Sequence, residues 1–291
     1  MPAAARNPLR SLRLVACSLA CLAAPGTHAE APPRFRLDLG FAADSFSKNY
    51  SDPGYGHHRE GTEGAGFLEL GYRLAPAITL LAGGDLSSPV GQVDGRFNVG
   101  AYFAALETVL LNASIAYAPN RHLVPRWDLT AGLDWQALSW LALLGNVRHL
   151  DFPSDSLSGL PSGHDTVTSV SGGLRLSAIP RTTLTVQSGF SHHTGTTSGG
   201  GSDSQIPGTG FVSGRVEFAA LESLSLSLGG AYGGESRRPF NPQLVSTVAS
   251  VSGGVRWQFA EAWAVRIDAV REAFDGEYLR NGASTALTVK F

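Results

Sequence analysis

Two short groupings in this sequence combine residue types that could do hydrolytic chemistry. One is Ser191-His192 with Asp203, and the other is His149 with Asp151. A hydroxyl, an imidazole and a carboxylate within hydrogen-bond reach can serve as a nucleophile, its base and the group that orients the base. The chain has no Gly-x-Ser-x-Gly elbow, the strained turn that exposes such a nucleophile. We therefore predict that the protein is not an enzyme, with a loop-borne surface hydrolase as the less favoured alternative.

Histidines are the residues that could bind a metal. His57-His58, His164 and His192-His193 fall in or beside segments that we interpret as loops, and imidazoles gathered at one rim could hold a divalent ion. No His-x-x-x-His spacing occurs, and neither pair has a cysteine beside it. We therefore predict no metal and no cofactor.

A much larger set of charged residues follows a period of two. Trp127, Leu129 and Leu133, for example, alternate with Asp128 and Asp134, which is the pattern of a strand with one apolar and one polar face. In a membrane barrel the polar face must point inward, because a charge on the lipid face costs about 2–4 kcal/mol near the midplane. The alternation predicts a lumen lined by Arg36, Asp38, Glu69, Arg73, Arg96, Asp128, Asp134, Arg148, Arg175, Arg215, Glu217, Arg256, Arg266, Asp268 and Lys290.

Fourteen segments show this alternation, and two kinds of connection join them in turn. Short connections such as 74–77 alternate with mostly longer ones such as 47–62, as in outer-membrane barrels with short periplasmic turns and longer external loops. We therefore predict an all-β fold, a closed antiparallel transmembrane β-barrel of about 14 strands, with 12 as the alternative. The predicted strands are 34–46, 63–74, 77–86, 94–104, 107–117, 125–137, 139–151, 165–178, 181–193, 208–219, 222–234, 245–259, 262–274 and 279–291.

Both ends of the sequence fit export to the bacterial outer membrane. Residues 1–29 have the arginines, the short apolar stretch and the Thr-His-Ala cleavage site of a secretory signal peptide. This leaves 30–291 for the barrel, without either of the two cysteines of the chain. At the other end, Leu287, Val289 and Phe291 form the outward-facing, aromatic-ended strand that we predict to be the signal for the barrel-assembly machinery.

Charge narrows the choice of partners. The chain carries 22 basic and 24 acidic residues, and loss of the signal peptide removes three of the basic ones. An acidic mature chain argues against a nucleic-acid partner. We expect outer-membrane lipid to surround the barrel, whereas the sequence does not identify a partner protein.

Four stretches of the chain resemble one known family. The central segment 123–129 (LVPRWDL), followed by 132–135 (GLDW), is similar to the centre of the YaiO-type outer-membrane β-barrel proteins. The stretch 148–152 (RHLDF) resembles that family's Arg-His-Leu-Asp-aromatic strand end, and 44–47 (DSFS) resembles the end of its first strand. The resemblance implies an outer-membrane location and a single barrel. It does not imply a particular substrate or reaction.

Two functions from different classes fit these observations. One is a pore or a solute or polymer conduit, for which a hydrated lumen with charges of both signs is sufficient. The other is a structural or accessory outer-membrane protein in envelope or exopolysaccharide assembly, in which cross-strand ion pairs seal the lumen. Sequence alone separates these hypotheses poorly, because both require the same inward charges.

Overall fold

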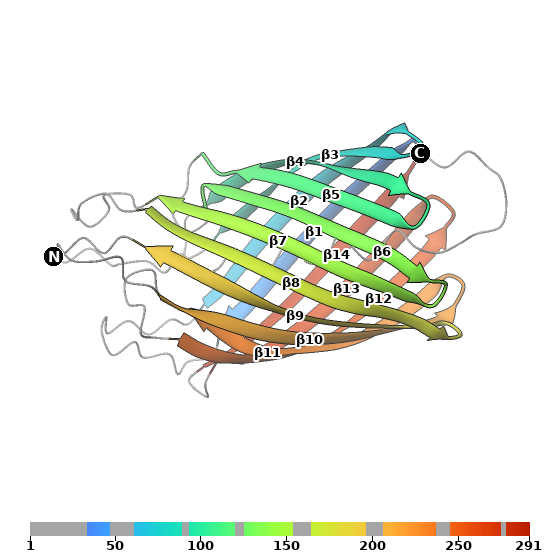
Figure 1. Cartoon of the computed structure of the whole chain (residues 1–291). Coiled ribbons are helices and arrows are strands. Elements are labelled where there is room, and N and C mark those ends of the chain that lie inside the picture. The colour runs from blue at the N-terminus through green and yellow to red at the C-terminus, as the bar shows by residue number, and fades with distance from the viewer. Residues whose placement is uncertain are drawn as a thin grey trace, which may run out of the picture.

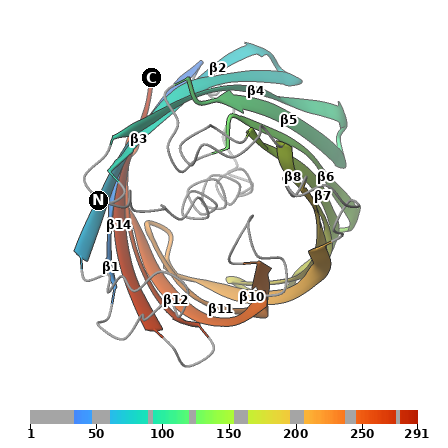
Figure 2. The same ribbon diagram turned by 90° about the vertical axis from the view of Figure 1, so that its left-hand side faces the viewer.

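The computed structural model describes residues 34–46, 61–88, 93–119, 125–153, 164–195, 206–236, 245–274 and 278–291. These residues form fourteen antiparallel strands that close into one barrel (Figures 1 and 2). Each strand pairs with its neighbours in the sequence, and β1 (Phe35–Phe46) closes the ring by pairing with β14 (Tyr278–Lys290). The fold predicted from the alternation is therefore confirmed, and the strand count is 14 instead of the alternative 12.

The strands are nine to sixteen residues long, which is enough to cross a bilayer at a tilt. Between β1 and β14 they are β2 (Gly61–Ala75), β3 (Ile78–Ser88), β4 (Asp94–Leu106), β5 (Val109–Tyr117), β6 (Trp127–Leu138), β7 (Leu141–Pro153), β8 (His164–Ile179), β9 (Thr182–Gly195), β10 (Ile206–Leu221), β11 (Leu224–Ser236), β12 (Val245–Ala260) and β13 (Trp263–Phe274).

The two ends of the barrel differ in how their strands are joined. We name the end that carries the C-terminus the turn rim (Figure 1). There, two residues join the strands of each of six pairs: β2–β3, β4–β5, β6–β7, β8–β9, β10–β11 and β12–β13. One of these turn residues, Arg181 between β8 and β9, has a φ of 61°, a left-handed conformation found in tight turns. The connections at the opposite end, the loop rim, lie largely outside the described residues, as do His57, His58 and Asp203. Residues 1–33, with the predicted signal peptide, also lie outside them.

Closure of the ring is complete down to the turn rim. Beyond the last register pair of β1 and β14, the amide of Phe35 donates to the carbonyl of Phe291 at 2.9 Å, and the amide of Phe291 donates back at 3.1 Å. The rings of these two residues stack with their centroids 5.7 Å apart. The aromatic C-terminus therefore completes the seam between the first and last strands.

The outer surface of the barrel is apolar. Phe97, Leu228 and Phe41 are 66%, 65% and 60% exposed, and only a few apolar residues are buried among those described. Contact between such an apolar surface and water is unfavourable, whereas its contact with hydrocarbon is favourable. Aromatic side chains gather near the turn rim, where the ring centroids of Trp257 and Phe259 lie 5.6 Å apart. The outer surface is thus the lipid-facing band of a transmembrane barrel with an aromatic girdle.

Glycine in some strands makes room for aromatic rings on the inner face. Phe211 of β10 has glycine on both neighbouring strands. A Cβ atom on Gly189 would lie 2.6 Å from its ring, and one on Gly233 would lie 2.6 Å from its Cα. The high glycine content of the chain therefore has a packing role at these positions. No helix in the described part of the chain is long and apolar enough to span a membrane.

Opposite faces of one strand should respond differently to a new charge. Val251 of β12 is 52% exposed on the outer face, whereas its neighbour Ser250 faces inward, opposite Glu272 of β13 in the register. We expect Val251→Arg to lower the free energy of unfolding in lipid vesicles by about 2–4 kcal/mol. The loss would be measured by denaturant titration followed by tryptophan fluorescence.

Ser250→Arg is the matched control, because it adds the same side chain one residue away but beside an inner carboxylate. We expect a smaller loss of unfolding free energy than in Val251→Arg, because the new guanidinium faces a carboxylate and the lumen instead of hydrocarbon. Equal losses in the two variants would contradict the assignment of the two faces.

Candidate functional site

The inner wall of the barrel is the candidate site, because the register places on it every charged residue selected from the sequence. Lys290 of β14 lies opposite Arg36 of β1, and Asp38 lies opposite Glu69 of β2. On each strand these positions alternate with exposed apolar ones such as Leu39. The same parity holds on the remaining strands for Arg73, Arg96, Asp128, Asp134, Arg148, Arg175, Arg215, Glu217, Arg256, Arg266 and Asp268.

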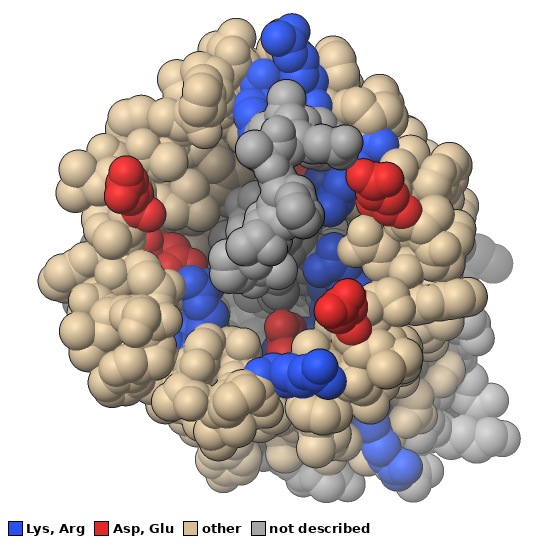
Figure 3. Space-filling model, turned by 90° about the vertical axis from the view of Figure 1, so that its right-hand side faces the viewer, with Lys and Arg blue, Asp and Glu red and all other residues tan. Residues whose placement is uncertain are grey.

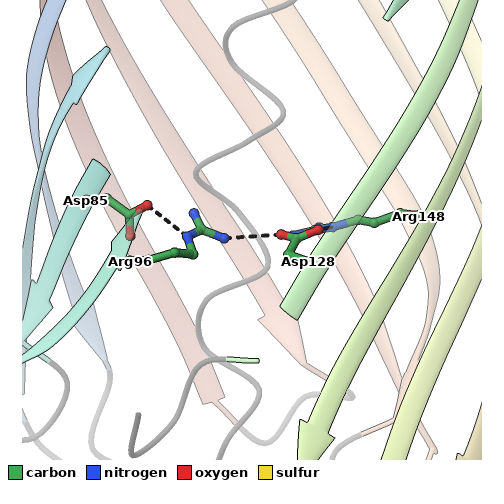
Figure 4. Close-up of polar contacts among 4 residues, drawn as sticks. All are labelled: Asp85, Arg96, Asp128 and Arg148. Atoms are coloured by element: carbon green, nitrogen blue, oxygen red, sulfur yellow. Dashed lines mark hydrogen bonds and ion pairs between the residues drawn. The ribbon is translucent and has the colours of Figure 1, made fainter. Parts of the chain in front are cut away.

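Four of the inner charges form a continuous chain toward the loop rim, which we name the loop-side ion chain (Figure 4). Arg96 Nε contacts Asp85 Oδ1 at 2.8 Å, and its Nη1 contacts Asp128 Oδ2 at 3.2 Å. Arg148 then binds the same carboxylate of Asp128 in bidentate fashion, with Nε–Oδ1 at 2.9 Å and Nη2–Oδ2 at 2.5 Å. The loop-side ion chain links β3, β4, β6 and β7 through charges of alternating sign.

The ion chain has to cross β5, and small side chains on that strand make the crossing possible. Ala116 of β5 lies opposite Asp128 in the register and is 8% exposed, and Ala118 just beyond the strand is 1% exposed. A long side chain at either place would occupy the space through which Arg96 reaches Asp128. The alanines therefore let a contact form between strands that are not neighbours.

Burial makes the loop-side ion chain a structural brace. Arg96 is 5% exposed and Asp128 is 4% exposed. An ion removed from water loses several kcal/mol of hydration, which only a well-formed partner can offset. Two guanidinium and two carboxylate groups compensate one another here, so each charge depends on its neighbours in the chain.

A second brace near the loop rim lies at the seam where the barrel closes. Arg280 of β14 forms an ion pair with Asp44 of β1, and its Nη1 lies 3.5 Å from Glu272 Oε2 of β13. Glu272 is 3% exposed. One guanidinium thus ties the last strand to both of its neighbours.

Ion pairs nearer the turn rim are more exposed. Arg175 of β8 reaches across β7 to Asp134 of β6 in a bidentate pair of 2.6 and 3.0 Å, with both side chains about one quarter exposed. Arg215 and Glu217, two residues apart on β10, meet at 2.8 Å and are each 34% exposed. These pairs therefore keep part of their hydration.

The remaining turn-side pairs lie around the closing seam. Arg36 binds Asp38 at 2.6 Å and Glu69 at 3.3 Å, and Thr288 donates to Asp38 at 2.6 Å. On β13, Arg266 binds Asp268 at 2.6 Å. Within the described part of the chain, three inner cations have no side-chain ion pair or hydrogen bond: Arg73, Arg256 and Lys290.

Sequence reasoning missed four charged residues that take part in the braces: Asp44, Asp85, Glu272 and Arg280. All four lie toward the loop ends of their strands. There the sequence does not distinguish the last residue of a strand from the first residue of a loop. A usable signal was present nonetheless. Glu272 has the same parity as Asp268 on one strand, and Arg280 has the same parity as Lys290 on another.

Within the described residues, the structure separates Ser191 from His192 and keeps His149 and Asp151 on one face of β7. Ser191 and His192 are consecutive on β9, so their side chains point to opposite faces; Ser191 contacts Ser169 at 2.8 Å on the inside. His149 lies on the outer face and contacts Thr168 there at 2.9 Å. No group of His, Cys, Asp and Glu in the described ranges could hold a metal ion.

Comparison with solved structures supports the same architecture. The monoaromatic hydrocarbon channel CymD matches with a TM-score of 0.61 at 13% identity, over 90% of this chain and 89% of that one. The toluene transporter TodX of P. putida matches with 0.58 at 10% identity, over 90% and 91%. A bacterial polysaccharide outer membrane secretin matches with 0.56 at 11% identity, over 90% and 100%. At these identities the likeness shows a shared fold.

Fold and outer surface together define the class: the chain is a bacterial outer-membrane β-barrel with 14 strands. No family model and no curated protein matches the chain. Its resemblance to the YaiO-type proteins is accordingly not confirmed as membership.

The loop-side ion chain leads to a prediction about stability. Asp128→Asn would leave Arg96 and Arg148 buried beside a neutral amide, and we expect the free energy of unfolding in detergent to fall by about 3 kcal/mol. Asp268→Asn is the control, because this carboxylate is 21% exposed and has one arginine partner in the described contacts. Its expected cost is about 1 kcal/mol or less. Similar losses in both variants would refute the role of burial.

Proposed function

We propose that the barrel is a conduit whose lumen conducts water-soluble solutes or a polymer across the outer membrane. The observation that carries this proposal is that charged side chains inside a closed barrel retain access to solvent. Arg215 and Glu217 are each 34% exposed, and Arg175 and Asp134 are 26% and 24% exposed, although all four point inward. Water that reaches these groups also provides a path for polar solutes.

A structural or accessory role in envelope or exopolysaccharide assembly is the second candidate. The buried braces favour it, because Arg96, Asp128 and Glu272 are at most 5% exposed near the loop rim. Such burial is expected where side chains fill the interior. The two candidates thus differ in whether the loop-rim end of the lumen is open.

The resemblance to the YaiO-type proteins belongs to this proposal. It rests on the central segments 123–129 and 132–135, and it supports a single barrel without a set substrate. We further propose that residues 1–29 are removed on export. In this proposal the barrel-assembly machinery recognises Leu287, Val289 and Phe291. Leu287 and Val289 lie on the outer face of β14, where a second protein could reach them.

Conduction can be tested with a cysteine on either face of one strand. Ser171 of β8 faces the lumen near mid-strand, and Val170 beside it is 54% exposed on the lipid face. The sequence from residue 30 onward contains no other cysteine. We expect refolded protein to form channels in planar bilayers, and a sulfonate-bearing thiosulfonate reagent to lower the single-channel conductance of Ser171→Cys, because the attached group narrows the lumen.

Val170→Cys, treated in the same way, is the matched control and should conduct as before. The absence of conductance from the parent protein over a range of voltages would remove the conduit proposal in favour of the sealed barrel. Equal block of both cysteine variants would show that the current does not pass through the lumen.

A further inference from the structure

Five basic side chains share the inner face toward the turn rim. They belong to strands that are consecutive around the ring: Arg256 on β12, Arg266 on β13, Lys290 on β14, Arg36 on β1 and Arg73 on β2. We name this set the basic wall. Figure 3, which views the turn-rim end, shows Lys and Arg atoms around the opening and on its inner side, together with Asp and Glu atoms.

The strand register brings like charges of the basic wall together. Arg36 lies directly opposite Lys290, and Arg256 lies directly opposite Arg266. Like charges in opposed positions on neighbouring strands destabilise a sheet. Two such pairs on one stretch of wall are therefore unfavourable unless an opposite charge lies near each of them.

Carboxylates of the protein compensate only part of the basic wall. Asp38 and Glu69 bind Arg36, and Asp268 binds Arg266. The wall thus has five basic groups for three carboxylates, each of which already contacts a guanidinium. In the described part of the chain, no ion pair or hydrogen bond reaches the side chains of Arg73, Arg256 and Lys290.

The charge balance reverses toward the loop rim. There the described acidic groups Asp44, Asp85, Asp128 and Glu272 outnumber the basic groups Arg96, Arg148 and Arg280, and the ion pairs among them are more deeply buried. On the inner wall, the basic groups thus exceed the carboxylates toward the turn rim, although the turns there also carry the exposed acidic residues Glu107, Glu222 and Glu261. An anion inside the turn-rim end of the lumen meets three cations that have no ion pair within the described part of the chain.

We propose that the basic wall is a binding site for anions that carry several carboxylate or phosphate groups and enter the barrel from the turn rim. Guanidinium groups bind such oxygens in bidentate fashion, and the Lys290 ammonium adds a point charge. Two anionic groups on one solute could bridge Arg256 and Lys290, or Lys290 and Arg73, which lie two strands apart, and would relieve the repulsion between like charges. This proposal rests on the proposed conduit, since it names the solutes that the lumen admits.

Citrate is a suitable probe, because it carries three carboxylates and is small. We expect calorimetry to show that citrate binds the refolded barrel in detergent at low salt. Binding should weaken by about two- to tenfold in Arg73→Gln/Arg256→Gln, as the loss of two partly screened ion contacts implies. In planar bilayers the same variant should shift the reversal potential toward lower preference for chloride over potassium. Higher salt should reduce both effects.

Arg181→Gln/Arg271→Gln is the charge-matched control. Arg181 lies exposed in the turn between β8 and β9, and Arg271 lies exposed on the outer face of β13. Citrate affinity in this variant should stay within about twofold of the parent protein. Equal weakening in both double variants, or no citrate binding by the parent protein, would overturn the proposal.

Two comparisons complete the test. The first distinguishes failure of the basic wall from failure of the conduit, and the second asks whether the bound anion is a polymer or a small solute. Conductance without citrate binding or anion preference would overturn the basic wall and leave the conduit standing. Citrate binding that depends on Arg73 and Arg256 without conductance would support the wall and remove the conduit. Polyglutamate added on one side should lower the current more strongly from the turn-rim side; competition with citrate there supports a polymer as the source of the carboxylates, and its absence supports small solutes.

Discussion

Backbone hydrogen bonding in a medium without water is the constraint on which the structure depends. Hydrocarbon has no donor for a carbonyl and no acceptor for an amide, so every strand in the bilayer needs a partner on both sides. The pairing of β1 with β14, continued by the reciprocal bonds of Phe35 and Phe291, supplies the last two edges. Because the barrel is closed, each side chain on a strand faces either the lipid or the lumen. Phe41 meets lipid, and its neighbour Gly40 meets the lumen.

That division explains why so much of the fold could be predicted from sequence. All fourteen predicted strands lie within about two residues of those observed, because alternation is forced wherever one face meets lipid and the other meets water. The short turns were equally visible, as each breaks the alternation for two residues, for example at Pro180-Arg181. The same parity selected inner charges such as Arg175 and Glu217.

Contacts between these inner charges could not be predicted in the same way. Arg96 reaches Asp128 by crossing β5, and Arg175 reaches Asp134 by crossing β7, so neither pair follows from neighbouring strands. Such contacts depend on the stagger between strands and on the small size of Ala116, neither of which periodicity reveals. The predicted strand 181–193 already contained Ser191 and His192, so alternation alone places their side chains on opposite faces, as observed in β9.

The two ends of the inner wall therefore differ in what their charges do. Toward the loop rim, each buried ion is matched closely, and the cost of leaving Arg96 or Asp128 without its partner holds β3 to β7 in one arrangement. Toward the turn rim, ions such as Arg215 and Glu217 stay hydrated, and hydrated ions can exchange partners at little cost. A conduit needs both properties, because a rigid frame keeps the lumen in shape while exchangeable charges let a solute bind and leave. Arg73, Arg256 and Lys290, which have no ion pair within the described part of the chain, lie toward the turn rim, where exchange is easiest.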